Sequence, residues 1–84
     1  MIPLTDRQTE VLAFMFQFFD ENDQLPTMAM IAGYFGWGSA NNAQEICSVL
    51  HRKQMLEKNC LGKNKFSALA KQYREHIKRI KGQA

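Results

Sequence analysis

Residues 36–50, with the sequence GWGSANNAQEICSVL, predict a glycine-marked turn followed by a helix with two chemically different faces. Apolar residues recur there at the intervals of three, four and seven positions that bury one side of a helix. The apolar side consists of Ala43, Ile46, Cys47 and Leu50, and the opposite side consists of Asn41, Gln44, Glu45 and Ser48. We therefore expect a helix that buries one face and presents amide, hydroxyl and carboxylate groups on the other.

This polar face has two interpretations. Asn and Gln side chains near the start of a helix suit the edge of adenine in the DNA major groove, and Glu suits cytosine. A polar stripe is also the usual appearance of a helix face that meets only water. The stretch alone leaves both interpretations open.

The composition suits one small domain with one modest core, because the chain has 84 residues of which 45% are hydrophobic. Its apolar runs are too short for a membrane span, and its N-terminus lacks the layout of a secretory signal. We therefore expect a cytoplasmic protein without a membrane partner.

The chain offers little for metal or catalytic chemistry. Cys47 and Cys60 are too few for a disulfide framework and are expected to be reduced thiols. A metal site would have to combine them with His51 and His76, and no close-spaced ligand pair of the zinc type is present. No glycine-rich phosphate loop or nucleophile–base pair is visible either. The sequence predicts neither a metal nor a cofactor, and it does not predict an enzyme.

Charge is divided unevenly along the chain. Residues 1–42 carry one basic and five acidic side chains, whereas residues 43–84 carry ten basic and three acidic ones. A one-sided basic field attracts polyanions such as nucleic acids. A solvated surface, an acidic protein and lipid headgroups remain alternatives.

Three helices are expected between residues 6 and 53. Thr5 is placed to cap a helix over residues 6–19, Thr27 a helix over 28–35, and Ser39 a helix over 40–53. In the first helix the apolar arc should contain Val11, Phe14, Met15, Phe18 and Phe19, with Leu12 and Phe16 at or beyond its edge and Phe16 the more exposed of the two. Gly36 is expected to end the second helix in a left-handed conformation.

A hairpin and a last helix are expected to follow. Residues 55–60 and 65–66 flank a glycine and asparagine turn at 61–64, which predicts a short hairpin. Residues 67–81 are again amphipathic. The expected organisation is a winged helix-turn-helix domain over residues 1–66 and a basic amphipathic helix with its tail over 67–84. The fold class is mainly α with a small β-hairpin.

This layout and its motifs resemble the DNA-binding domain of LexA-type repressors. The match runs without gaps from about residue 4 to about residue 57. The matching residues are Leu4, Thr5, Arg7, Gln8, Glu10 and Val11; Pro26, Thr27, Ala29, Ile31 and Ala32; Gly36, Ser39, Asn41, Ala43 and Glu45; and Leu50, Arg52 and Lys53.

The resemblance implies a sequence-specific regulator of transcription, expected to be a repressor, whose partner is double-stranded DNA. The third helix would then read bases, and its end together with the hairpin, or wing, would contact phosphates. The implied base contacts are Ser39, Asn41, Asn42, Gln44, Glu45 and Ser48. The implied phosphate contacts are Arg52, Lys53, Lys58, Lys63 and Lys65.

The sequence also departs from the family's pattern. It ends at Ala84, where LexA-type proteins continue into a self-cleaving peptidase domain, so control by autoproteolysis is not expected. Met30 stands where a glutamate usually completes a capping box, and Gln54 stands where a glycine usually ends the third helix. Small size without a sensor domain suggests a regulator from a phage or another mobile element.

The apolar stripe of the last helix has two interpretations. It could dimerise the domain on a palindromic site, or it could fold back and enlarge the core. The candidate dimer or partner surface consists of Leu69, Tyr73, Ile77, Ile80 and Phe16.

The alternative function is that of a phage or plasmid adaptor that binds a host regulatory or replication protein. Aromatic residues that are exposed mark protein interfaces more often than DNA contacts. Those that suggest this alternative are Phe14, Phe16, Phe18 and Trp37.

Overall fold

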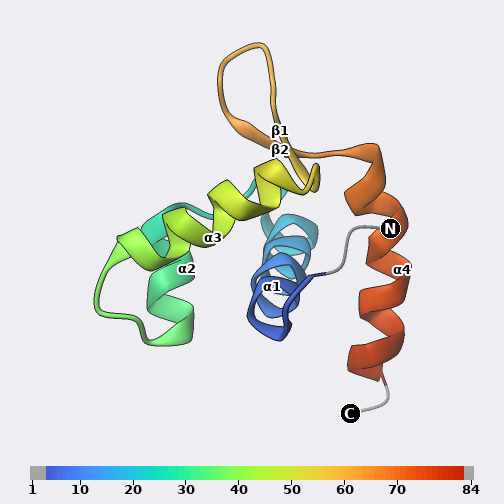
Figure 1. The fold of residues 1–84 in the computed structure, drawn as a ribbon, viewed down its shortest axis with the longest axis horizontal. Helices are drawn as coiled ribbons and strands as arrows, with labels where there is room; N and C mark the ends of the chain where they lie inside the picture. Colours follow the sequence, from blue (N-terminus) through green and yellow to red (C-terminus); the bar gives the residue numbers. More distant parts are fainter. Residues whose placement is uncertain (1–3, 83–84) are drawn as a thin grey trace.

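The computed structural model describes residues 4–82, with side chains over residues 4–76. Its elements are α1 (Asp6–Asn22), α2 (Met28–Phe35), α3 (Ala40–Arg52), β1 (Leu56–Lys58), β2 (Asn64–Phe66) and α4 (Ala68–Gly82). Helix α1 lies at the centre, with α2 and α3 on one side and α4 on the other (Figure 1). The hairpin of β1 and β2 projects beyond the helices. The predicted fold class, a mainly α domain with a small hairpin, is confirmed.

Helix α1 begins where the sequence predicts and ends later. The Thr5 hydroxyl accepts a hydrogen bond from the Gln8 backbone N–H at 3.2 Å, and the Gln8 amide oxygen accepts one from the Thr5 N–H at 3.1 Å. This reciprocal pair is a capping box. The predicted end at residue 19 is wrong, because the polar residues that follow continue the helix to Asn22. The helix stops at Asp23, whose φ of 61° is left-handed.

The two shorter helices confirm their predicted caps. The Thr27 hydroxyl accepts from the Met30 N–H at 3.1 Å, and the apolar Met30 side chain has no oxygen with which to accept a hydrogen bond in return. Gly36 ends α2 with φ of 73°, as expected for a left-handed cap. Ser39 caps α3 by accepting from the Asn41 N–H at 3.1 Å.

The hairpin is antiparallel and is fastened to the helices at its base. Leu56 pairs with Phe66, Glu57 with Lys65, and Lys58 with Asn64. Gln54, at the glycine position of the family pattern, takes a left-handed φ of 65°. Its carbonyl accepts a 2.5 Å hydrogen bond from the hydroxyl of Ser67, which also accepts from the Ala70 N–H at 3.0 Å and so caps α4.

The core lies between α1, α2, α3, the base of the hairpin and α4. On the inward side of α3, Ala43, Cys47 and Leu50 are buried as predicted, and Ile46 is half-buried against the core. Desolvation by burial raises the pKa of the Cys47 thiol from 9.0 to about 11, and nearby Lys58 only partly offsets this.

The predicted arc of α1 is partly wrong. Leu12 and Phe16, expected at its edge, are 0% and 5% exposed, whereas Phe19, expected inside, is 37% exposed. For Phe16 the cause is the hairpin, because the Phe16 ring stacks on Phe66 with centroids 4.2 Å apart. Elements distant in sequence thus bury the side of α1 that was expected to face water.

Helix α4 folds back onto α1. Ala70 and Tyr73 join the core at 0% and 6% exposure, and Leu69 packs against it. Arg74 forms an ion pair with Asp20 of α1. Phe16 and Tyr73 are therefore buried within one chain, which agrees with the fold-back interpretation of the last helix, and the dimer interpretation stays a prediction. The side chains of Ile77 and Ile80 lie outside the described residues.

Candidate nucleic-acid interface

The outward face of α3 is polar and accessible. The buried positions Ala43, Cys47 and Leu50 fix the rotation of the helix, so its other side is turned to solvent. All six side chains predicted to contact bases are exposed: Ser39, Asn41, Asn42, Gln44, Glu45 and Ser48. Because the Ser39 hydroxyl caps the helix, the freest hydrogen-bonding groups are those further along it.

The two basic residues at the end of α3 differ in their surroundings. Arg52 is exposed. Lys53 is half-buried, and its Nζ donates a 2.7 Å hydrogen bond to Gln8 Oε1 in α1. The ammonium group of Lys53 therefore ties α3 to the capping box of α1.

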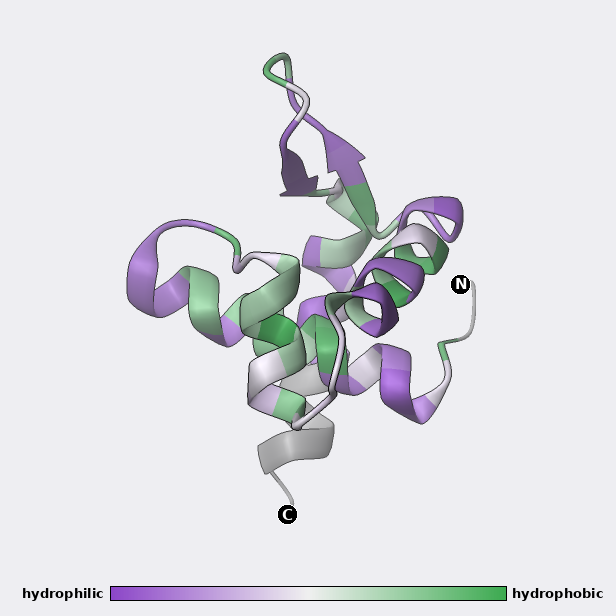
Figure 2. Ribbon diagram, turned by 90° about the vertical axis from the view of Figure 1, so that its left-hand side faces the viewer, coloured by the Kyte–Doolittle hydropathy of each residue, from purple (hydrophilic) through white to green (hydrophobic). Residues whose placement is uncertain are grey.

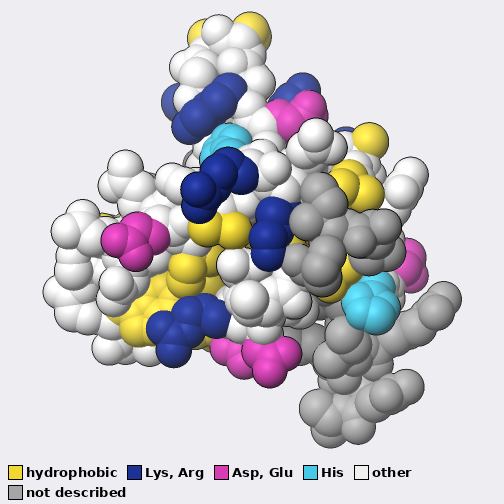
Figure 3. All heavy atoms as spheres, in the orientation of Figure 1, with side chains coloured by type: hydrophobic (Ala, Val, Ile, Leu, Met, Phe, Trp, Pro, Cys, Tyr) yellow, Lys and Arg dark blue, Asp and Glu magenta, His cyan; other side chains and the backbone are white. Residues whose placement is uncertain are grey.

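The hairpin carries the remaining predicted phosphate contacts. Lys58, Lys63 and Lys65 are all exposed. Asn59 orders the loop between the strands, because its Oδ1 accepts from the backbone N–H groups of Leu61 at 2.8 Å and Lys63 at 3.0 Å. Lys and Arg side chains gather on the hairpin and beside it over the helices (Figure 3).

The hydropathy of the surface follows the same division. Hydrophilic residues cover the outer turns of the helices and most of the hairpin, while hydrophobic residues lie where the helices face one another (Figure 2). Leu61, in the hairpin loop, is an exception at 76% exposure. The polar face of α3 and the basic hairpin are thus exposed to solvent. The apolar faces of the helices pack against one another and fix the positions of these two exposed surfaces.

Two contacts that sequence reasoning overlooked position the hairpin. His51 Nε2 and Asn64 Oδ1 form a 2.9 Å hydrogen bond that joins α3 to β2. The Ser67 hydroxyl closes the base of the hairpin by donating a hydrogen bond to the Gln54 carbonyl. Both contacts span 13 positions, so no local pattern could have revealed them.

Other kinds of site find little support in the described part of the chain. No group of three or more His, Cys, Asp or Glu side chains over these residues could hold a metal ion. Among the same residues no helix has both the length and the hydropathy needed to span a bilayer.

Two helices joined by a tight turn, the second presenting polar side chains, followed by a basic antiparallel hairpin, define a winged helix-turn-helix domain. The chain belongs to the LexA DNA binding domain family, whose model matches residues 1–60.

Individual relatives agree with this assignment. The chain is 46% identical over 57 residues to the LexA repressor of Vibrio cholerae serotype O1. The aligned residues cover 68% of this chain and 27% of that protein. It is 42% identical over 57 residues to the LexA repressor of Pseudomonas chlororaphis, covering 68% and 28% respectively. The chain thus spans roughly a quarter of the length of these relatives, and α4 lies beyond the residues matched by the family model.

Proposed function

We propose that this domain binds double-stranded DNA in a sequence-specific manner and represses transcription, with α3 in the major groove and the hairpin on the phosphate backbone. The observation that carries the proposal is the exposed polar face of α3 opposite a buried one. Membership of a DNA-binding domain family and similarity to proteins named LexA repressor support it.

Base recognition is assigned mainly to Asn41, Gln44 and Glu45. These side chains are exposed and spaced so that they share one face of α3. One well-formed bidentate contact between such a side chain and a base discriminates by about 1 to 3 kcal/mol. The sequence that the domain prefers depends on this set, together with the neighbouring Asn42 and Ser48.

Phosphate binding is assigned to Arg52, Lys58, Lys63 and Lys65. These side chains are exposed, and a charged contact to phosphate adds affinity without reading sequence. Lys53 is expected to contribute less to phosphate binding, because its ammonium group already donates a hydrogen bond to Gln8.

Selection from a pool of random duplexes tests the proposal. Enrichment of one motif by the full chain is the expected result. A chain in which both Asn41 and Gln44 are changed to alanine should lose that motif and keep salt-sensitive binding, while Gln72→Ala on α4 serves as the exposed control. An unchanged motif in the double variant would contradict the assigned reading face.

One observation favours a second candidate, the protein-binding adaptor. Tyr34 and Met30 of α2 are 60% and 49% exposed, and the Tyr34 ring stacks on Phe14 with centroids 4.2 Å apart. Exposed apolar surface of this kind is a feature of protein interfaces. Failure to enrich any DNA motif, together with a stoichiometric protein partner lost on Tyr34→Ser, would favour this candidate.

A further inference from the structure

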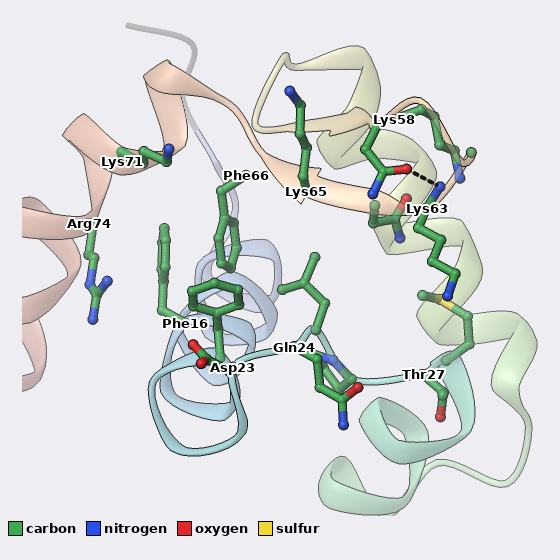
Figure 4. A pocket seen from close by; sticks show the side chains of 17 residues that line it. Phe16, Asp23, Gln24, Thr27, Lys58, Lys63, Lys65, Phe66, Lys71 and Arg74 are labelled. Atoms are coloured by element: carbon green, nitrogen blue, oxygen red, sulfur yellow. Dashed lines mark hydrogen bonds between the residues drawn. The ribbon is translucent and has the colours of Figure 1, made fainter.

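A basic hollow lies between the hairpin, the loop that joins α1 to α2, and the start of α4. Every described element except α3 contributes to its lining. Its apolar part includes Phe16, Phe19 and Phe66, and its cationic residues are Lys58, Lys63, Lys65, Lys71 and Arg74. In Figure 4 the labelled lysines lie on the hairpin and on α4, across from the loop that carries Gln24 and Thr27.

The charges of the hollow are unbalanced. Arg74 is paired with Asp20, and Asp23 is the acidic residue of the lining. None of the four lysines forms an ion pair with a carboxylate of the described residues. Like charges gathered on one surface repel each other, and a bound anion removes that repulsion. The hollow is therefore electrostatically suited to a polyanion.

The shape and the chemistry of the hollow favour phosphates on an extended ligand. Small-molecule sites bury most of their ligand, whereas this hollow is partly open to solvent. Ammonium groups on flexible stems bind phosphate oxygens as point charges, without demanding one fixed geometry. Three of the lysines already belong to the hairpin assigned to the DNA backbone, so the same backbone is the natural occupant.

Helix α4 adds a further cation to this surface. Arg74 holds α4 on α1 through Asp20 and lies over the Phe16 ring at 5.2 Å. Lys71, on the preceding turn of α4, is exposed and lines the hollow. We propose that the hollow binds DNA backbone phosphates, with Lys71 as a phosphate contact that α4 contributes beyond the region shared with the family. This inference rests on the proposed function.

A matched pair of variants tests the inference. Lys71→Gln and Gln72→Glu each lower the net charge by the same amount at neighbouring exposed positions, but only Lys71 lines the hollow. Binding of the full chain to a duplex is measured by fluorescence anisotropy over a series of salt concentrations. Lys71→Gln should make the plot of log K against log salt shallower by about 0.9, the loss of one phosphate contact. Gln72→Glu should keep the slope of the unaltered chain.

The outcomes separate this inference from the proposed function. Equal slopes for the two variants, with DNA binding intact, overturn the role of Lys71 and leave the proposed function standing. Absence of salt-sensitive DNA binding by the unaltered chain overturns both.

Titration with inorganic pyrophosphate alone, followed by backbone amide NMR, distinguishes a free anion from the DNA backbone. We expect weak shifts without saturation. Saturable binding that Lys71→Gln abolishes would assign the hollow to a small phosphate compound and overturn the DNA assignment.

Discussion

Gln8 Oε1 accepts two hydrogen bonds, one from the Thr5 backbone N–H at 3.1 Å and one from Lys53 Nζ at 2.7 Å. The first bond completes the capping box that starts α1, and the second comes from the residue that follows α3. One amide oxygen therefore couples the start of the central helix to the end of the helix assigned to base recognition. Gln8, which belongs to the capping box of α1, therefore also helps to fix the position of α3.

Removal of the Gln8 amide should destabilise the domain without touching the α3 face. Gln8→Ala loses both bonds and should lower the free energy of unfolding by about 1 to 2 kcal/mol. Gln8→Glu keeps both acceptors and adds a charge-assisted bond to Lys53, so its stability should equal or exceed that of the unaltered chain. Urea unfolding followed by circular dichroism measures both. Equal losses in the two variants would argue against the role of the Lys53 contact.

Replacement of Gln54 by glycine should stabilise the domain. Gln54 has a left-handed φ of 65°, which costs a residue with a side chain about 1 kcal/mol relative to glycine. Gln54→Ala has the same backbone cost and is the matched control, so it should bring no such gain. The melting temperatures of the two variants, compared with that of the unaltered chain, measure whether the left-handed conformation at position 54 destabilises the domain.

Loss of the Ser67 hydroxyl should weaken the base of the hairpin. Ser67 is 7% exposed and bonds both the Gln54 carbonyl and the Ala70 N–H. Ser67→Ala should therefore lower the free energy of unfolding by about 1 to 3 kcal/mol. Ser48→Ala, at an exposed position, should change it by less than about 0.5 kcal/mol. Similar values for the two serines would contradict the packing of α4 described above.

The two cysteines should differ in reactivity and in their effect on pH dependence. Cys60 is exposed, whereas burial raises the pKa of Cys47 to about 11. Near neutral pH an alkylating reagent should modify Cys60 first and reach Cys47 only after unfolding. The folded state holds the Cys47 proton more tightly than the unfolded one, so this thiol's contribution to stability falls as the pH rises from about 9 to about 11. Peptide mass spectrometry of the alkylated chain checks the order of modification. Comparison of alkaline unfolding between the unaltered chain and Cys47→Ala checks the pH dependence.

Local signals in the sequence predicted much of the fold. Thr5, Thr27 and Ser39 cap helices as short side chains with an acceptor oxygen are expected to do, and Gly36 takes the left-handed conformation that glycine tolerates. The periodicity of residues 40–50 placed the buried and exposed faces of α3 correctly. These features depend on residues within a few positions of each other.

Contacts between distant segments were beyond such reasoning. The burial of Phe16 depends on Phe66, and the orientation of Lys53 depends on Gln8, 45 positions earlier. The hollow gathers Lys63 and Lys71 from the hairpin and α4, and periodicity within one element does not show how two elements meet. The predicted base contacts are exposed as required, and their role in DNA recognition stays a proposal.

The most direct measurement of the central claim is a competition titration on the full chain. A labelled duplex with the selected motif is displaced by an unlabelled copy of itself or by a duplex of scrambled sequence. The unaltered chain should be displaced far more readily by the motif, and the Asn41 and Gln44 double alanine variant should respond alike to both duplexes. Equal competition by both duplexes against the unaltered chain would contradict sequence reading by α3.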